Sequence, residues 1–166
     1  KRLMDLNQQV SQDTKNLTTA LKGEAKTQGT WGEIILERVL EMSGLVRDRE
    51  YFVQESLVAA DGSRQQPDVR VCLQPNRNLI VDSKVSLVAY ERYASAEDDA
   101  ARETALQQHL VSFRTHIKDL SEKNYPALYG FESLDFTLLF IPVEPAFLVA
   151  VQADPDLYGM AWKKHI

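Results

Sequence analysis

The period of the hydrophobic residues changes at Gly44, and this change limits the possible folds more than any other feature. Between residues 30 and 42 the apolar side chains recur every three or four positions, which predicts a helix. Beyond Gly44 they alternate with polar residues, which is typical of strands with one covered face. A chain with both periods is neither purely helical nor purely β, so we expect class α/β or α+β.

Four strands are predicted in the rest of the chain. Asp61 and Gly62 form the turn after the first strand, because Asp-Gly favours hairpin geometry. A turn that contains Pro75 separates the second strand from the third. The fourth strand is almost wholly apolar, as expected for a strand covered on both faces. The strands are predicted at 51–54, 68–73, 79–84 and 136–141.

Helical spacing accounts for most other residues. Gly29 and Gly32 are expected to break the first helical stretch, and the acids at 97–99 favour a helix start through the helix dipole. The helices are predicted at 1–28, 30–42, 87–93, 96–122, 144–153 and 155–165. This order of elements predicts a mixed central sheet flanked by helices.

The first 28 residues differ from the rest. Leu3, Leu6, Val10 and Leu17 follow the steps of a heptad among mostly polar neighbours. Two interpretations are open: a helix packed on its own domain, or the end of a coiled coil that begins upstream. Residues 29–166 are expected to form one domain. Both ends of the sequence look cut, so we expect a fragment of a longer protein whose domain is truncated at its C-terminus.

Composition excludes several classes of protein. No apolar run reaches the roughly 20 residues of a membrane helix. The single cysteine, Cys72, excludes an internal disulfide and is expected to be a small buried hydrophobic residue. The three histidines, which include His109, are expected at the surface rather than at a metal. The formal net charge of −5 gives no sign of a nucleic-acid partner.

One constellation of charged residues falls on predicted strand ends. Asp68 begins the second strand, and Asp82 and Lys84 end the third. If these strands are antiparallel neighbours, Asp68 and Asp82 lie close together at one edge of the sheet. Two carboxylates suit Mg²⁺ or Mn²⁺. Lys84 would project from the same face as Asp82, where it could hold a water or stabilise charge on phosphorus.

The helix at 30–42 offers a further acid. Glu33 and Glu37 are four residues apart and therefore share one helical face. Taken alone, such a pair is usually a solvated face, and an acid two residues before a lysine occurs by chance in most proteins. The combination of an acidic helix with the two strand ends is more specific than any of its parts.

Pro67-Asp68 and Asp82-Ser83-Lys84, in this order of elements, resemble the core of the PD-(D/E)xK nucleases, which have the restriction-endonuclease-like fold, so the resemblance favours class α/β. The stretches 29–45, 81–87 and 140–144 are more specifically similar to the RmuC family of bacterial DNA recombination proteins. This resemblance covers essentially residues 22–166.

The RmuC resemblance implies a nuclease domain that limits rearrangement between short inverted repeats. It implies DNA as partner, in branched, hairpin or inverted-repeat form, and no small-molecule cofactor. The family carries a long coiled coil before this domain, so residues 1–28 would be its end and would support homo-oligomers. It also implies a place on the cytoplasmic side of a bacterial cell, with a membrane anchor in an N-terminal segment that this sequence lacks.

The resemblance also assigns roles to the residues of the strand ends. Asp68 and Asp82 would bind the metal through their carboxylates, and the main-chain carbonyl of Ser83 would add a ligand because its side chain points to the other face. Lys84 would orient the attacking water and stabilise the pentacovalent phosphate. Phosphodiester hydrolysis with one or two Mg²⁺ or Mn²⁺ ions follows.

Three further residues are assigned to the same site. Glu33 would contact the metal directly or through water, with Glu37 as the alternative, and Gln54 on the first strand would lie near the site. Two other functions stay open: a scaffold that grips DNA or protein without cutting, and a helical assembly protein with no nucleic-acid role.

Overall fold

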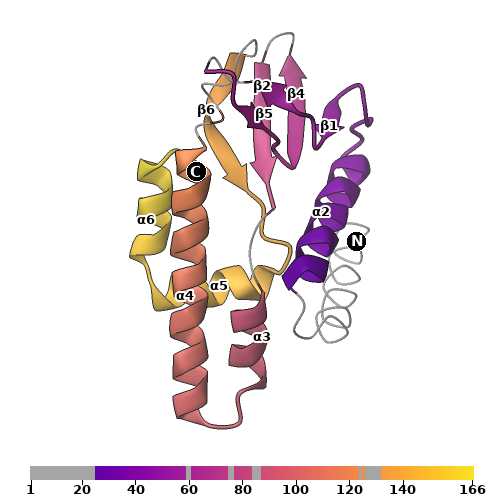
Figure 1. Ribbon diagram of the computed structural model, residues 1–166. Helices are drawn as coiled ribbons and strands as arrows, with labels where there is room; N and C mark the ends of the chain where they lie inside the picture. Colours follow the sequence, from indigo (N-terminus) through magenta and orange to yellow (C-terminus); the bar gives the residue numbers. More distant parts are fainter. Residues whose placement is uncertain (1–24, 59–60, 75–76, 84–86, 124, 126–131) are drawn as a thin grey trace.

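The computed structural model describes residues 25–58, 61–74, 77–83, 87–123, 125 and 132–166, and all structural statements concern these residues. They form a four-stranded sheet, a two-stranded ribbon and a set of helices (Figure 1). The strands of the sheet are β1 (Tyr51–Val53), β4 (Val69–Gln74), β5 (Arg77–Asp82) and β6 (Glu132–Leu139). The helices are α2 (Ala25–Met42), α3 (Val88–Ser95), α4 (Asp99–Glu122), α5 (Glu144–Ala153) and α6 (Asp156–Lys163).

The sheet has the order β1-β4-β5-β6 and is mixed, as predicted. β4 runs antiparallel to both β1 and β5, whereas β5 and β6 are parallel. The crossover between β5 and β6 contains α3 and α4, because parallel neighbours need a long connection. α3, α4 and α5 gather at the end of the sheet to which β5 and β6 point (Figure 1).

The two faces of the sheet are covered by different elements. Val69, Val71 and Val81 point to one face, where they pack with Leu36 of α2 in a buried cluster. Ile80 points to the other face, as alternation requires, and packs there with a second buried set. That set consists of Leu57, Leu120 and Tyr125, from β2 (Leu57–Val58), α4 and the residues just after α4.

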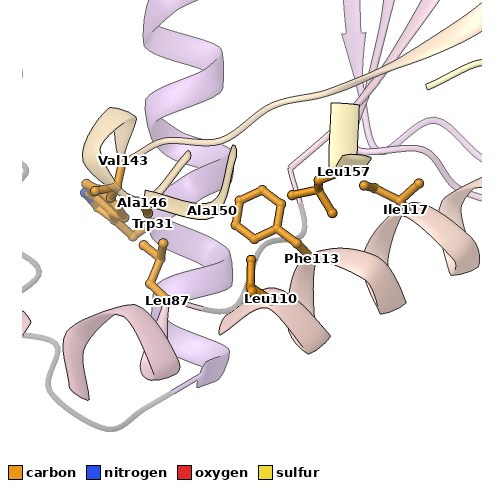
Figure 2. Packing of buried hydrophobic residues seen from close by; sticks show 9 residues of the cluster. All are labelled: Trp31, Leu87, Leu110, Phe113, Ile117, Val143, Ala146, Ala150 and Leu157. Atoms are coloured by element: carbon orange, nitrogen blue, oxygen red, sulfur yellow. The ribbon is translucent and has the colours of Figure 1, made fainter. Parts of the chain in front are cut away.

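The largest buried cluster lies among the helices. Trp31 of α2 reaches Leu87, Val143 and Ala146, which belong to the start of α3 and the start of α5 (Figure 2). Phe113 of α4 continues the same cluster. Burying a large apolar side chain of this kind stabilises the fold by about 1.5–3 kcal/mol. Trp31 therefore packs α2 against the helical layer formed by α3, α4 and α5, while Leu36 packs α2 against the sheet.

Helix boundaries agree with the predicted ones except in α2. This helix runs through Gly29 and Gly32 without interruption, so the expected break there is wrong. α4 begins after Asp98, whose side chain accepts a hydrogen bond of 2.7 Å from the N–H of Ala101. That contact is an N-cap and confirms the acidic helix start. Most of the predicted arm, residues 1–28, lies outside the described residues.

Two predictions about single residues are wrong. His109 is fully buried, not at the surface, because it lies on the apolar face of α4 and its Nε2 donates a hydrogen bond of 2.8 Å to the carbonyl of Ala146. Cys72 is half-buried rather than buried, and its Sγ lies 3.1 Å from a guanidinium nitrogen of Arg70. Its environment is therefore polar on one side.

The ribbon of β2 (Leu57–Val58) and β3 (Arg64–Gln65) was not predicted as strands. Its two strands are antiparallel, with Leu57 opposite Gln65. The predicted Asp-Gly turn lies between them, and Gly62 has a positive φ of 82°, which suits glycine. No helix in the described part of the chain is long and apolar enough to cross a lipid bilayer.

Candidate active site

Three strands bring their ends together at one edge of the sheet. Val69 faces both Val53 of β1 and Val81 of β5, so the next residues along are Gln54, Asp68 and Asp82. The N–H of Gln54 donates a hydrogen bond of 2.9 Å to the carbonyl of Asp68. The antiparallel pairing of β4 and β5 is as predicted, and with it the meeting of the two strand ends.

Asp68 and Asp82 are both buried, with 4% and 2% of their surface exposed. Carboxylates are seldom so buried unless they are paired or hydrogen-bonded. Oδ2 of Asp68 accepts a hydrogen bond of 2.7 Å from the N–H of Ser83. This contact fixes the Asp68 carboxylate against the end of β5, beside Asp82.

Asp82 has a partner that the sequence did not reveal. Nζ of Lys123 lies 3.4 Å from its Oδ1, although 41 residues separate them in the chain. Lys123 is the residue just after α4, and about a third of its side chain is exposed. Leu120 and Tyr125, on either side of it, are buried against Ile80 and so position the lysine. The apolar spacing of α4 predicts which residues are buried but does not single out this lysine.

Ser83 is the third buried residue of this edge, with 3% of its surface exposed. Its side chain points to the face that α2 covers. A methyl group built on Gly32 would lie 3.0 Å from its Oγ, which is closer than side chains normally approach. Within the described residues this Oγ has no hydrogen-bond partner. The side chain therefore points toward α2, and Gly32 allows α2 to approach.

The two candidate acids of α2 lie in different surroundings. Glu33 accepts a hydrogen bond of 2.9 Å from Nε2 of Gln54, which connects it to the edge that holds Asp68. Glu37 instead accepts hydrogen bonds from Arg47 and from the hydroxyl of Tyr51. Glu33 is therefore the acid of α2 that lies beside the strand ends, and Gln54 links it to them.

Gln54 has an unusual backbone conformation for a residue of this type. Its φ is 48°, in the left-handed region that non-glycine residues seldom adopt. Nε2 of Gln66 donates a hydrogen bond of 2.6 Å to its carbonyl, so both its main chain and its side chain are held. Lys84, the predicted catalytic lysine, lies outside the described residues.

The residues of this edge suit a hard cation in part. Among the described residues, no three His, Cys, Asp or Glu side chains form a group that could hold a metal ion. Mg²⁺, however, usually keeps several waters and is bound by one or two carboxylates together with substrate phosphates. Asp68 and Asp82 supply two carboxylates, so they fit a cation whose shell is completed by water and substrate.

Comparison with known proteins places the chain in a family. The model of the RmuC family matches residues 1–166, the full length of the sequence. The chain belongs to the RmuC family. Its RmuC relatives include proteins named DNA recombination protein RmuC homolog in Vibrio cholerae and Pseudomonas aeruginosa, and DNA recombination protein RmuC in Escherichia coli. Each is 51% identical to this chain over 166 residues.

These RmuC relatives are much longer than the chain. The alignments cover 100% of this sequence but 32%, 36% and 35% of the three relatives, so the chain spans about a third of their length. No solved structure matches the chain. The structure shows a mixed α/β architecture, and the restriction-endonuclease-like fold stays a prediction.

Proposed function

We propose that this chain is a metal-dependent DNA nuclease domain, which hydrolyses phosphodiester bonds in DNA recombination. Membership of the RmuC family supports the role in recombination, since the relatives carry that name. The observation that supports hydrolysis best is the pair of buried acids, Asp68 and Asp82, at neighbouring ends of β4 and β5. Because the chain spans about a third of its relatives, the proposal concerns this domain first.

In this proposal Asp68 and Asp82 hold Mg²⁺ or Mn²⁺, and the main-chain carbonyl of Ser83 adds a ligand. The cation, when bound, lowers the pKa of a bound water and offsets negative charge on the phosphate. Lys84 orients the attacking water, from its position two residues after Asp82. The pairing of β4 with β5 and the hydrogen bond from the N–H of Ser83 hold the Asp68 carboxylate in place.

Glu33 has a supporting part in the same proposal. Its carboxylate is held by Gln54, which follows β1 directly and contacts the main chain of Asp68. From there it contacts the cation directly or through a water. Glu37 is engaged by Arg47 and Tyr51, so we assign the acid of α2 to Glu33.

Electrostatics also favour a cation at this edge. Two buried carboxylates at neighbouring strand ends repel each other, and a bound cation would relieve that repulsion. A DNA phosphate that approaches such a pair is repelled as well unless a cation lies between them. A bound divalent ion would reduce both the repulsion between the two carboxylates and their repulsion of the phosphate.

The test is a cleavage assay with end-labelled linear, hairpin and four-way branched DNA in Mg²⁺, Mn²⁺ or EDTA. We expect cleavage by the parent protein in metal, with preference for hairpin or branched DNA. Asp82→Asn and Lys84→Ala should lower the rate by roughly 100-fold or more, in line with the loss of one transition-state contact. Asp61→Asn, an exposed acid in the turn after β2, is the matched control.

Two results would contradict the proposal in different ways. If Asp82→Asn and Lys84→Ala cut as fast as the parent, the site is assigned to the wrong residues. If the parent cuts none of the substrates in any metal, the domain is not a nuclease in isolation.

A second candidate function is DNA binding without cleavage. It is favoured by the protein partners that Asp68 and Asp82 already have, the N–H of Ser83 and the ammonium of Lys123. It is also favoured by the lack of a three-residue metal group within the described residues. Tight binding in EDTA, with no cleavage in any metal, would select this function.

The wider setting is proposed on the family resemblance alone. We expect the longer RmuC proteins to form homo-oligomers through the coiled coil before this domain, and to be held by an N-terminal segment on the cytoplasmic side of the membrane. Sedimentation of a full-length relative, with and without its coiled coil, would test the first point.

A further inference from the structure

A polar pocket lies beside the candidate active site, between β3 and the C-terminal end of α4. Its volume is about 530 Å³. Its walls include Arg64, Gln65 and Gln66 on one side and Lys123 on the other. None of these residues belongs to the predicted nuclease motifs.

Lys123 and Gln66 connect this pocket to residues of the candidate active site. Lys123 lines the pocket and at the same time places its Nζ 3.4 Å from Oδ1 of Asp82. Gln66 lines it from the opposite wall and donates to the carbonyl of Gln54 at 2.6 Å. Gln66 also stands directly before Pro67-Asp68 in the chain. A group bound in the pocket against Lys123 would therefore be separated from Asp82, a candidate metal ligand, by that one side chain.

Buried apolar residues hold both walls of the pocket in position. Leu120 and Tyr125 flank Lys123 and are almost fully buried. Nζ of Lys123 lies 5.4 Å from the centre of the Tyr125 ring, within range of a cation–π contact. Leu57 of β2, the partner of β3, belongs to the same buried cluster. Both walls are thus anchored on the face of the sheet that carries Ile80.

The polar groups of the pocket suit a phosphate. Arg64 is exposed and Lys123 is partly buried, so one cation lies at the surface and one lies deeper.

Two carboxylates limit how an anion can bind. Asp119 and Glu122 of α4 also line the pocket, and Glu122 lies 3.8 Å from Lys118. The two acids balance the two cations of the lining, so the pocket has no net charge and its general attraction for an anion is weak. An anion would bind by direct contact with Lys123 and Arg64, which suits one phosphate group better than a broad stretch of duplex.

We infer that this pocket binds a phosphate of the DNA backbone next to the one that is cleaved, with Lys123 as the inner cation and Arg64 as the outer one. The inference rests on the proposed function for its substrate class. It adds two DNA-binding residues, 41 residues and 18 residues from Asp82 in the chain, to those of the motifs. Lys123 then has two contacts, Asp82 on one side and the substrate phosphate on the other.

The test measures DNA binding and does not depend on cleavage. Fluorescence anisotropy of a labelled hairpin DNA is recorded in Ca²⁺ and in EDTA between about 50 and 200 mM salt. Lys123→Gln and Arg64→Gln should each weaken binding several-fold. Each should also reduce the slope of log K against log salt by about 0.7–0.9, the value for one lost phosphate contact.

Three variants complete the design. Arg92→Gln removes an exposed arginine of α3, away from the pocket, and should bind as the parent does. Asp119→Asn removes an acid from the pocket wall and should tighten binding. Lys123→Arg keeps the charge and should restore most of the affinity, which a purely structural loss would not allow.

The outcomes separate this inference from the proposed function. If the parent binds DNA but Lys123→Gln and Arg64→Gln match the control in affinity and salt slope, the pocket is not a phosphate site. If the parent binds but never cuts, while Lys123→Gln and Arg64→Gln bind more weakly with reduced salt slopes, the proposed activity fails and the pocket stands as a DNA-phosphate site. If the parent binds DNA in neither Ca²⁺ nor EDTA, both are overturned.

Discussion

Trp31, Gly32 and Glu33 are consecutive residues of α2, but each contacts a different part of the molecule. Trp31 is buried in the helical layer, Gly32 faces Ser83 at the end of β5, and Glu33 accepts a hydrogen bond from Gln54. The three contacts set the position of α2 against both the sheet and the helices. At the residue scale, this explains why a tryptophan and a glycine stand directly before the candidate acid.

Gly32→Ala should reveal the close approach of α2 and β5. Alanine gains about 1 kcal/mol over glycine inside a helix, but its methyl group would lie 3.0 Å from Oγ of Ser83. Overpacking of this kind costs about 1–3 kcal/mol, so we expect a net loss of stability. In a Ser83→Ala background the same change should stabilise, because the hydroxyl is gone. Urea unfolding of the four proteins checks this, and equal effects of Gly32→Ala in both backgrounds would contradict it.

His109 should make stability depend on pH. Burial lowers the pKa of this imidazole below its ordinary value, an effect that its hydrogen bond to Ala146 opposes in part. The unfolded chain therefore takes up a proton at a pH where the folded protein does not. Stability is retained above the unfolded pKa of about 6.5 and falls as the pH drops below it.

The measurement is urea unfolding at several pH values between about 7.5 and 5. His109→Gln should flatten the pH dependence in this range, while the exposed His165→Asn serves as control. An unchanged pH dependence in His109→Gln would contradict the assignment.

At the element scale, the hydrophobic periods account for most of the fold. The change at Gly44 correctly separates α2 from the sheet, and the antiparallel pairing of β4 with β5 follows from the short turn between them. β2 and β3 are two residues each, too short for a period to identify. Pairing also accounts for the meeting of Asp68 and Asp82, whereas Lys123 reaches Asp82 through tertiary packing of α4, which no local pattern encodes.

The role of α2 as a connecting element can be tested at Trp31. Trp31→Ala should lower the free energy of unfolding by about 3–5 kcal/mol, because it leaves a cavity between α2, α3 and α5. Trp162→Ala is the matched control, since Trp162 is 73% exposed, and it should cost less than about 0.5 kcal/mol. Urea unfolding measures both changes, and a similar small cost at the two tryptophans would mean that α2 is not anchored through Trp31.

At the scale of the whole molecule, the candidate site lies where the sheet meets the helical layer. β5 ends there at Asp82, α2 passes it at Gly32, and α4 ends there at Lys123. The formal net charge of −5 is therefore a poor guide to the partner of this chain. What matters is the local arrangement: Asp68 and Asp82 are buried at the strand ends, and the neighbouring pocket is lined by Lys123 and Arg64 together with Asp119 and Glu122.

Asp68 and Asp82 are proposed to form a metal site together, and titration with Mn²⁺ followed by electron paramagnetic resonance measures this binding. We predict saturable binding to the parent protein, with at least tenfold weaker binding by Asp68→Asn and by Asp82→Asn. Asparagine can still accept the hydrogen bond from Ser83, so Asp68→Asn should keep the fold, which its urea midpoint would verify. Equal Mn²⁺ binding by the parent and both variants, or no saturable binding by the parent, would contradict the claim.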